Sequence, residues 1–300
     1  MTATRLLHVA ILLVMGAVWG LQFAMLKLAS GGGHAEISLV FYAMLAGAVF
    51  FGVVVAIRGA WFPWTGRLVF FLAYIAVLGY VVPMLAVLYT GPHLSAGMIT
   101  LIASLAPVVA IAIALLKRSE FVSGIRIGAV ALGLAASMLV LWPELRLPDH
   151  GSLGWLGVAF VIPIMFGYQA VYISAHWPTG LDSLQIAFGE VVVAALCVLP
   201  LHLTVGDWIA YDPAWPPAQI GIAVFTVSSL LEAILYFYLV QHAGGVLVSF
   251  GSFVSLFAGI LWGMTLFGER HDAVFWFAIA VTCGALALLV FDKAEHKKSA

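Results

Sequence analysis

Apolar residues run along this chain in long uninterrupted stretches that are separated by short polar turns. Continuous apolar runs of about 20 residues are typical of helices that cross a lipid bilayer, whereas strict alternation would indicate strands. The pattern predicts an all-α integral membrane protein with ten transmembrane helices. They are expected at Leu7–Leu28, Ile37–Ile57, Leu68–Thr90, Leu94–Leu116, Val122–Trp142, Leu153–His176, Ser183–Leu203, Gln219–Val240, Gly244–Phe267 and Ala273–Phe291.

The composition agrees with a membrane protein and excludes several other classes. Of the 300 residues, 64% are hydrophobic and only 8% are charged, whereas a soluble domain carries about 25% charged residues. The formal net charge of −1 and the absence of a Lys/Arg-rich block argue against a nucleic-acid partner. Cys197 and Cys283 lie in apolar runs without a CxxC or His neighbour, so we expect no metal and no other cofactor.

The chain contains one pattern twice. Tyr89, His93 and Glu120 recur as Tyr238, His242 and Glu269, always 149 residues later (238 − 89, 242 − 93 and 269 − 120). An earlier match joins Trp19-Gly20-Leu21-Gln22 to Phe166-Gly167-Tyr168-Gln169 at a spacing of 147 (166 − 19). A repeat of about half the chain length indicates duplication. We therefore expect two five-helix units, 1–146 and 147–300, the second with a short cytoplasmic tail.

The distribution of Lys and Arg predicts the orientation of the helices. With ten spans, one side of the membrane holds nine of these residues and the other side holds three, namely Lys27, Arg146 and Arg270. The positive-inside rule therefore places both termini in the cytoplasm of a bacterial-type inner (plasma) membrane. Because each unit has an odd number of spans, the two units must be inverted relative to one another. Inverted repeats of this kind are a transporter architecture, with the substrate site near the midplane.

Several short motifs resemble those of the drug/metabolite transporter superfamily, specifically the EamA-type exporters. They are Trp19-Gly20 in the first helix, Gly268-Glu269-Arg270 before the last helix, and Pro107. The first copy of the Gly-Glu-Arg motif, Arg118-Ser119-Glu120, keeps only the Glu. The resemblance implies ten helices and export of a small molecule. The length and the aromatic-rich helices are also similar to those of bacterial aromatic amino-acid exporters.

Two carboxylates lie inside expected spans, Glu190 and Glu232. A charge at the bilayer centre costs about 2.5–3.5 kcal/mol on insertion scales, so each must face a cavity or a partner. Glu232 lies near the middle of its span, where it could bind a substrate ammonium or carry a coupling proton, or make a structural hydrogen bond. Glu190 lies seven residues from the cytoplasmic end, so it could extend toward that side. For Glu190 a structural hydrogen bond is the favoured role, and a part in gating or coupling is the alternative.

Amide and aromatic side chains on the same helices are candidates for substrate binding. An uncharged amide can donate to a carboxylate and accept from an ammonium, and rings favour stacked or edge-to-face contact with an aromatic ligand. Together with Glu232, the candidates are Trp19, Gln22, Phe23, Tyr80, Tyr168, Gln169, Tyr172, Tyr236 and Trp262. Interhelical hydrogen bonding and ordinary packing are the alternatives for each of them.

Other residues are candidates for gating and bending. Tyr89 with His93, and Tyr238 with His242, lie at span ends, where they form either a hydrogen-bonded turn or a gate. Prolines within spans remove a backbone hydrogen bond and are possible hinges or static kinks. They are Pro83, Pro107 and Pro163.

These observations predict a secondary transporter, not an enzyme. It would export aromatic and other neutral amino acids from the cytoplasm by alternating access, with the small solute and the lipid bilayer as partners and no obligate protein partner. The alternatives are an intramembrane enzyme, or an exporter of another metabolite or a cationic drug. The sequence has no HExxH, no Gly-x-Ser-x-Gly and no Gly-rich phosphate loop.

Overall fold

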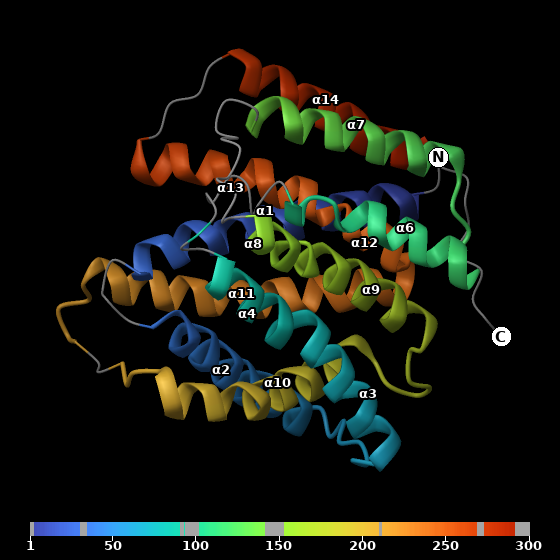
Figure 1. Cartoon of the computed structure of the whole chain (residues 1–300). Helices are drawn as coiled ribbons and strands as arrows, with labels where there is room; N and C mark the ends of the chain where they lie inside the picture. The colour runs from blue at the N-terminus through green and yellow to red at the C-terminus, as the bar shows by residue number, and fades with distance from the viewer. Residues whose placement is uncertain are drawn as a thin grey trace.

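The structure, a computed structural model, describes residues 3–30, 35–90, 93, 102–141, 153–209, 212–268 and 273–291. Within these ranges the regular structure is helical (Figure 1). The helices are α1 (Ala3–Ser30), α2 (Glu36–Ile57), α3 (Gly66–Ala76), the π-helix η1 (Val77–Val81), α4 (Val82–Thr90), α6 (Ala106–Lys117), α7 (Gly124–Leu141), α8 (Leu153–Ala159), α9 (Val161–Ala175), α10 (Ser183–Val205), α11 (Pro217–Ala243), α12 (Gly245–Ser249), α13 (Gly251–Phe267) and α14 (Ala273–Phe291).

These helices confirm the all-helical prediction. By length and composition, six helical stretches of the described residues could cross a membrane, and four shorter apolar helices accompany them. Each of the ten expected runs coincides with one of these segments. Within the described residues, four runs are interrupted inside: at η1, at the turn 104–105 before α6, at Phe160 between α8 and α9, and at Phe250 between α12 and α13.

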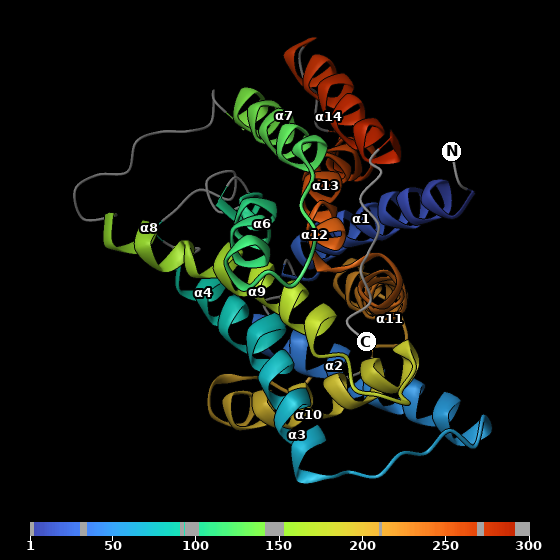
Figure 2. The ribbon, with the colours of Figure 1, turned by 90° about the vertical axis from the view of Figure 1, so that its right-hand side faces the viewer.

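The helices form a bundle in which two helix pairs lie at opposite edges. Helices α7 and α14 pack together at one edge, and α2 and α10 pack together at the other (Figures 1 and 2). Between these pairs, α1 packs against α11 and α13. Helix α9 packs against α4, α6 and α12. The broken helices α9 and α12 thus lie between the two edge pairs, whereas α3 lies beside α10.

The neighbours of α1 and α9 match the sequence repeat. Helix α1 contacts α11 and α13, which belong to the expected eighth and ninth spans. Its counterpart in the second unit, α9, contacts α4 and α6, which belong to the third and fourth spans. A two-fold relation between the units would produce these corresponding neighbours. The inverted relation itself stays a prediction.

Glycines let α1 and α13 approach closely. A Cβ atom added at Gly20 would lie 2.6 Å from the backbone nitrogen of Gly259, so α1 needs glycine at that position. Small residues serve this purpose in membrane helix pairs, where backbones pack directly. The similar pair Gly124 and Gly128 on α7 has no atom within 4 Å of its added Cβ positions. Glycine spacing alone therefore does not predict a helix contact.

Polar groups join α2 and α10 at both of their ends. At the start of α10, Asp182 and Gln185 form a reciprocal capping box, and Arg58 Nη2 donates to Asp182 Oδ2 at 2.9 Å. At the other end, Asp207 Oδ1 accepts from Ala35 N at 2.8 Å and from Ser38 Oγ at 2.9 Å. These contacts satisfy helix-end backbone groups and fix this inter-unit pair.

Candidate functional site

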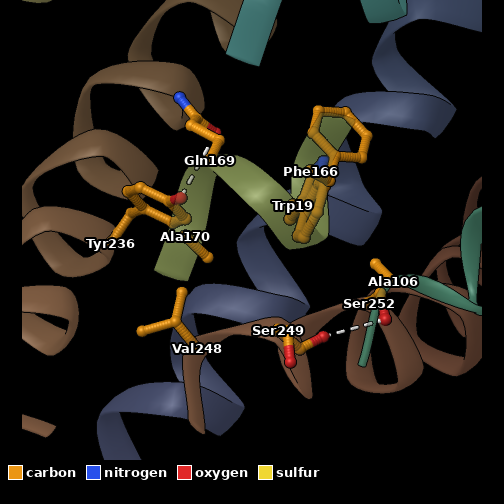
Figure 3. Close-up of a pocket in the computed structure, with 9 residues that line it drawn as sticks. All are labelled: Trp19, Ala106, Phe166, Gln169, Ala170, Tyr236, Val248, Ser249 and Ser252. Atoms are coloured by element: carbon orange, nitrogen blue, oxygen red, sulfur yellow. Dashed lines mark hydrogen bonds between the residues drawn. The ribbon is translucent and has the colours of Figure 1, made fainter. Parts of the chain in front are cut away.

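A small cavity lies where helices from both sequence halves converge. It is lined by Trp19 of α1, Ala106 of α6, Tyr236 of α11, three residues of α9, two of α12 and one of α13 (Figure 3). The remaining lining residues are Phe166, Gln169, Ala170, Val248, Ser249 and Ser252. The cavity encloses about 30 Å³, which is the space of roughly one water molecule. In this conformation the site is therefore closed around its own side chains.

Helix interruptions bring these residues together. Helix α6 begins at Ala106 with Pro107 in its first turn, and α12 ends at Ser249. Gly167 of α9 lies against α6, because a Cβ there would be 2.7 Å from the Ala106 carbonyl oxygen. Broken helices with small residues at their contact let side chains and freed backbone groups face a shared interior space.

The cavity wall combines aromatic rings with a few polar groups. The rings of Trp19 and Phe166 meet edge to face, with centroids 5.7 Å apart and planes 84° apart. Ser249 and Ser252 contribute hydroxyls, and Ser252 Oγ donates to the Ser249 carbonyl at 3.0 Å. Such a wall suits a ligand with a flat apolar part and a small polar part.

Gln169 is the most highly connected polar side chain at the cavity. Its Nε2 donates to the Ile75 carbonyl at 3.1 Å and to Glu190 Oε1 at 2.9 Å. Its Oε1 accepts from the Tyr236 hydroxyl at 3.3 Å (Figure 3). Gln169 is 5% exposed, and these contacts use both amide hydrogens and one of two acceptor positions. One side chain thus connects α3, α10 and α11.

Glu190 lies deeper than the sequence suggested. It is 1% exposed, and its carboxyl group accepts from Gln169 inside the bundle. The side chain thus points to Gln169 of α9 inside the bundle, and in this structure it does not extend toward the end of α10 as we expected. Among the described residues, neither Lys nor Arg forms an ion pair with it.

Glu232 lies on α11, one turn before Tyr236, and is half-buried. Within the described part of the chain, no hydrogen bond or ion pair to its carboxyl group is present. It interacts electrostatically with Glu190, and both carboxyl groups interact with Tyr80 on η1 and with Tyr236. The predicted residues Glu190, Glu232, Tyr80, Gln169 and Tyr236 thus form one polar group beside the cavity, which we call the polar cluster.

Tyr168 and Tyr172 point away from the cavity, although they flank Gln169 on α9. The Tyr168 hydroxyl accepts from Lys117 Nζ at 2.9 Å, and it lies 3.4 Å from the Tyr74 hydroxyl. Tyr172 stacks on His176 with centroids 4.4 Å apart. Successive helix residues point about 100° apart, so α9 presents these tyrosines to α3 and α6 while Gln169 and Phe166 face the centre.

Two predicted residues on α1 and α13 have different surroundings. The Trp262 indole Nε1 donates to the Ala17 carbonyl at 3.0 Å, so Trp262 joins α13 to α1 and does not line the cavity. Gln22 is half-buried one turn beyond Trp19. Its Nε2 is buried and has no hydrogen-bond partner among the described residues. A buried unpartnered donor indicates a missing polar partner.

The candidate gate residues form local ring stacks. His242 stacks on Tyr238 with centroids 4.3 Å apart, and its Nδ1 lies 2.8 Å from the Tyr238 carbonyl oxygen. His93 stacks on Trp155 of α8 at 4.2 Å. The Tyr238–His242 geometry fits the hydrogen-bonded turn that was one expectation. The side chains of Tyr89 and Phe23 lie outside the described residues.

All three predicted hinge prolines lie near helix interruptions. Pro83 follows η1, Pro107 lies in the first turn of α6, and Pro163 lies in the first turn of α9 after the break at Phe160. Their position at breaks is established by these helix bounds. Whether the breaks bend during function stays a prediction.

The sequence left six lining residues unrecognised. Phe166 was detectable, because it is the repeat counterpart of Trp19. Ser249 and Ser252 are polar residues in an otherwise apolar run, which is also a usable signal. Ala106, Ala170 and Val248 carry no such signal, since small and aliphatic residues pack equally well against lipid. No group of three or more metal-ligating side chains is present among the described residues.

A comparison with protein-family models indicates the class of protein from the first half of the chain. Residues 6–142 match the model of the EamA-like transporter family. This segment is similar to an EamA-like transporter unit. The match covers nearly all of the expected first unit, and it confirms the resemblance to EamA-type members of the drug/metabolite transporter superfamily. The family match and the apolar helices thus support a multi-pass membrane protein of the transporter class, which would act on a small solute in a lipid bilayer.

The fold of the protein also occurs in a solved structure. The crystal structure of another protein superposes on this chain with a TM-score of 0.76. The two sequences are 13% identical, and the alignment covers 94% of this chain and 97% of that chain. At this identity the similarity establishes the fold alone. A search of the curated proteins gave no match.

Proposed function

We propose that this EamA-type transporter exports neutral amino acids, chiefly aromatic ones, from the cytoplasm across a bacterial-type inner membrane. The observation that carries the proposal is the composition of the cavity wall. It joins the edge-to-face rings of Trp19 and Phe166 to amide and hydroxyl groups, with a carboxyl group nearby. An aromatic amino acid has a matching ring, carboxylate and ammonium.

The unpartnered groups of the site suggest which side chains meet the polar end of the solute. Gln169 is engaged by the protein itself, whereas the Gln22 amide nitrogen has no partner among the described residues. We assign the solute carboxylate to Gln22 and the solute ammonium to Glu232. A carboxylate without a cation is costly in the membrane interior, so Glu232 is expected to take up either a cationic group or a proton.

The closed cavity requires a change of conformation for transport. Ligand sites for small molecules enclose about 300–1,000 Å³, and the present cavity encloses about 30 Å³. We therefore propose alternating access, in which two inverted units, 1–146 and 147–300, move relative to one another. Both termini are cytoplasmic in this proposal.

Counterflow in proteoliposomes tests the function. Vesicles loaded with unlabelled phenylalanine should accumulate labelled phenylalanine transiently, and tyrosine and tryptophan should compete. Trp19→Ala should weaken the competition by aromatic amino acids more than that by alanine, because it removes half of the ring pair. Trp262→Phe is a matched control, since that indole contacts Ala17 and not the cavity. Equal loss in both variants would contradict the assignment of the cavity.

A cationic solute is the second candidate, and the unpaired Glu232 is the observation that favours it. In the same assay a lipophilic cation such as tetraphenylphosphonium would then compete while phenylalanine would not. Cysteine labelling at His93 and His242 tests the inverted arrangement separately. The two positions should be modified from opposite faces of the membrane, and modification of both from one face would exclude it.

A further inference from the structure

The π-helix η1 forms a seat for the Gln169 side chain. The segment Val77–Val81 is wound more widely than the α-helices on either side of it. Gly79 lies in this segment, and a Cβ atom there would collide with the Gln169 amide. Gln169 Nε2 instead approaches the backbone and donates to the Ile75 carbonyl at 3.1 Å. A side chain inserted into a helix ladder is a known cause of a helix kink.

Pro83 makes an interruption at this point necessary. Proline has no N–H, and its ring collides with the carbonyl four residues earlier in a regular helix. For Pro83 that residue is Gly79. The sequence therefore specifies both the break and the space beside it, and the amide that fills the space comes from the other sequence half.

The same amide also reaches the cavity. Its Oε1 accepts from the hydroxyl of Tyr236, and both residues line the cavity. Its second hydrogen goes to Glu190 on α10. A solute that hydrogen-bonds Tyr236 or Gln169 Oε1 would therefore compete with the hydrogen bond between these two residues. That bond helps to hold the Gln169 amide against η1. A ligand shifts a conformational equilibrium only through such a difference in contacts between two states.

We propose that Gln169 is a positioning residue of the transport cycle, which holds the α3–η1–α4 segment bent while the cavity is closed and releases it when solute binds. The inference rests on the proposed transport of a small solute. It adds that the bend at Gly79, seated by an amide from α9, couples occupation of the cavity to movement of the third span. The hydrogen bond to Glu190 keeps the Gln169 amide in the orientation that contacts both the Ile75 carbonyl and the Tyr236 hydroxyl.

The variant Gly79→Ala tests the seat from outside the cavity, because Gly79 itself is not a lining residue. The Gln169 amide that it displaces does line the cavity, so the KM for phenylalanine should change less than the maximal rate. The added methyl group should displace the amide, so the maximal rate should fall about fivefold or more, as expected for loss of coupling between two sites. Gly66→Ala is the matched control on the same helix, because its added Cβ has no atom within 4 Å.

A distance measurement separates coupling from simple loss of stability. Spin labels at Arg67 and His176, two exposed positions at the ends of α3 and α9, would be placed in a background without Cys197 and Cys283. Phenylalanine should change the distance distribution in the wild-type background and in Gly66→Ala. In Gly79→Ala the distribution should be the same with and without phenylalanine.

The double variant Gly79→Ala with Gln169→Ala guards against misfolding. Removing the amide makes room for the methyl group, so the protein should fold, while the solute-dependent distance change should still be absent. Wild-type rates in Gly79→Ala, a changed KM with an unchanged maximal rate, or a wild-type distance response in the double variant would overturn the inference. Failure of the proposed function looks different, because the wild-type protein itself would then show neither counterflow nor a distance response to phenylalanine.

Discussion

The two repeat-related glutamines have the same chemistry and opposite surroundings. Gln169 has partners on α3, α10 and α11, whereas the Gln22 amide nitrogen has none among the described residues. The difference follows from the residues that the repeat places around them. At the spacing of 147, the counterpart of Glu190 is Ala43, and at the spacing of 149, the counterpart of Tyr236 is Val87. The polar cluster therefore surrounds only one of the two glutamines.

The backbone beside each glutamine differs in the same way. At the spacing of 149, the counterpart of Gly79 is Ser228 on α11. Ser228 carries a Cβ, and its hydroxyl donates to the Phe225 carbonyl at 2.8 Å. Helix α11 runs without interruption from Pro217 to Ala243, while the matching span of the first half is divided by η1. The two halves thus contain two different half-sites. The one around Gln169 has its amide bonded within the protein, and the one around Gln22 has an amide nitrogen without a partner among the described residues.

Substituting each glutamine by leucine should give the largest difference in unfolding free energy between the two half-sites. Gln169→Leu removes three hydrogen bonds and leaves the Ile75 carbonyl and the Glu190 carboxyl group buried without their partner. Each such orphaned group costs about 1–3 kcal/mol, so the variant should lose roughly 3 kcal/mol of unfolding free energy. Gln22→Leu removes a donor that has no partner, so its stability should change by about 1 kcal/mol or less.

Unfolding by SDS in mixed micelles measures both variants against the wild type. Gln169→Glu is the control for side-chain size, since it has the shape of Gln169 but cannot donate two hydrogen bonds. Equal destabilisation by leucine at positions 22 and 169 would mean that Gln22 also has a structural partner. The comparison between the two half-sites would then be wrong.

Substituting the two carboxyl groups of the polar cluster should distinguish a role in transport from a role in stability. Glu232→Gln should leave membrane expression and unfolding free energy unchanged, because no described residue bonds to this carboxyl group. It should abolish most phenylalanine counterflow, because the amide can neither pair with the solute ammonium nor take up a proton. Glu190→Gln should keep an acceptor for the Gln169 amide, so its unfolding free energy should fall by about 1 kcal/mol or less.

Counterflow and unfolding measured on the same preparations check this pair. Wild-type counterflow in Glu232→Gln would assign Glu232 to packing. A greater loss of stability in Glu232→Gln than in Glu190→Gln would contradict the contacts described above. The pair therefore sharpens the distinction between the ligand-facing and the internally bonded carboxyl group.

The all-helical class and the positions of the helical segments could be predicted from the sequence, and the site only in part. Ten apolar runs of sufficient length determine ten helical segments, since the bilayer requires internal backbone hydrogen bonding. The breaks near Pro83, Pro107 and Pro163 were also predictable from proline chemistry. The break at Phe250 was not, because α12 contains no proline to mark it.

The orientation of each helix was the part that the sequence could not provide. In a soluble protein, polar residues mark the outward face of a helix. Here lipid covers the outside, so apolar side chains occupy both faces and neither is distinguished. Tyr168 and Gln169 were both assigned to the cavity for this reason, although only Gln169 lines it. The repeat supplies the missing signal at Phe166, since it aligns with Trp19 on the opposite wall.

The smallest effect on transport and stability is expected for substitutions at Ser228. This residue is the counterpart of Gly79, but it lies in a helix that is not interrupted. Ser228→Gly gives α11 the residue that Gly79 provides in the first half, at a cost of about 0.5–1 kcal/mol for a glycine within a helix. The α11 helix should stay straight, because the position four residues later is Glu232 and not a proline. Phenylalanine counterflow should equal that of Ser228→Ala, which removes the same hydroxyl but keeps the Cβ. A spin-label pair on either side of Ser228, at the exposed positions Ile220 and His242, would detect a bend as a changed distance. A bend in Ser228→Gly alone would mean that glycine by itself creates the break, and Pro83 would lose its assigned part in forming η1.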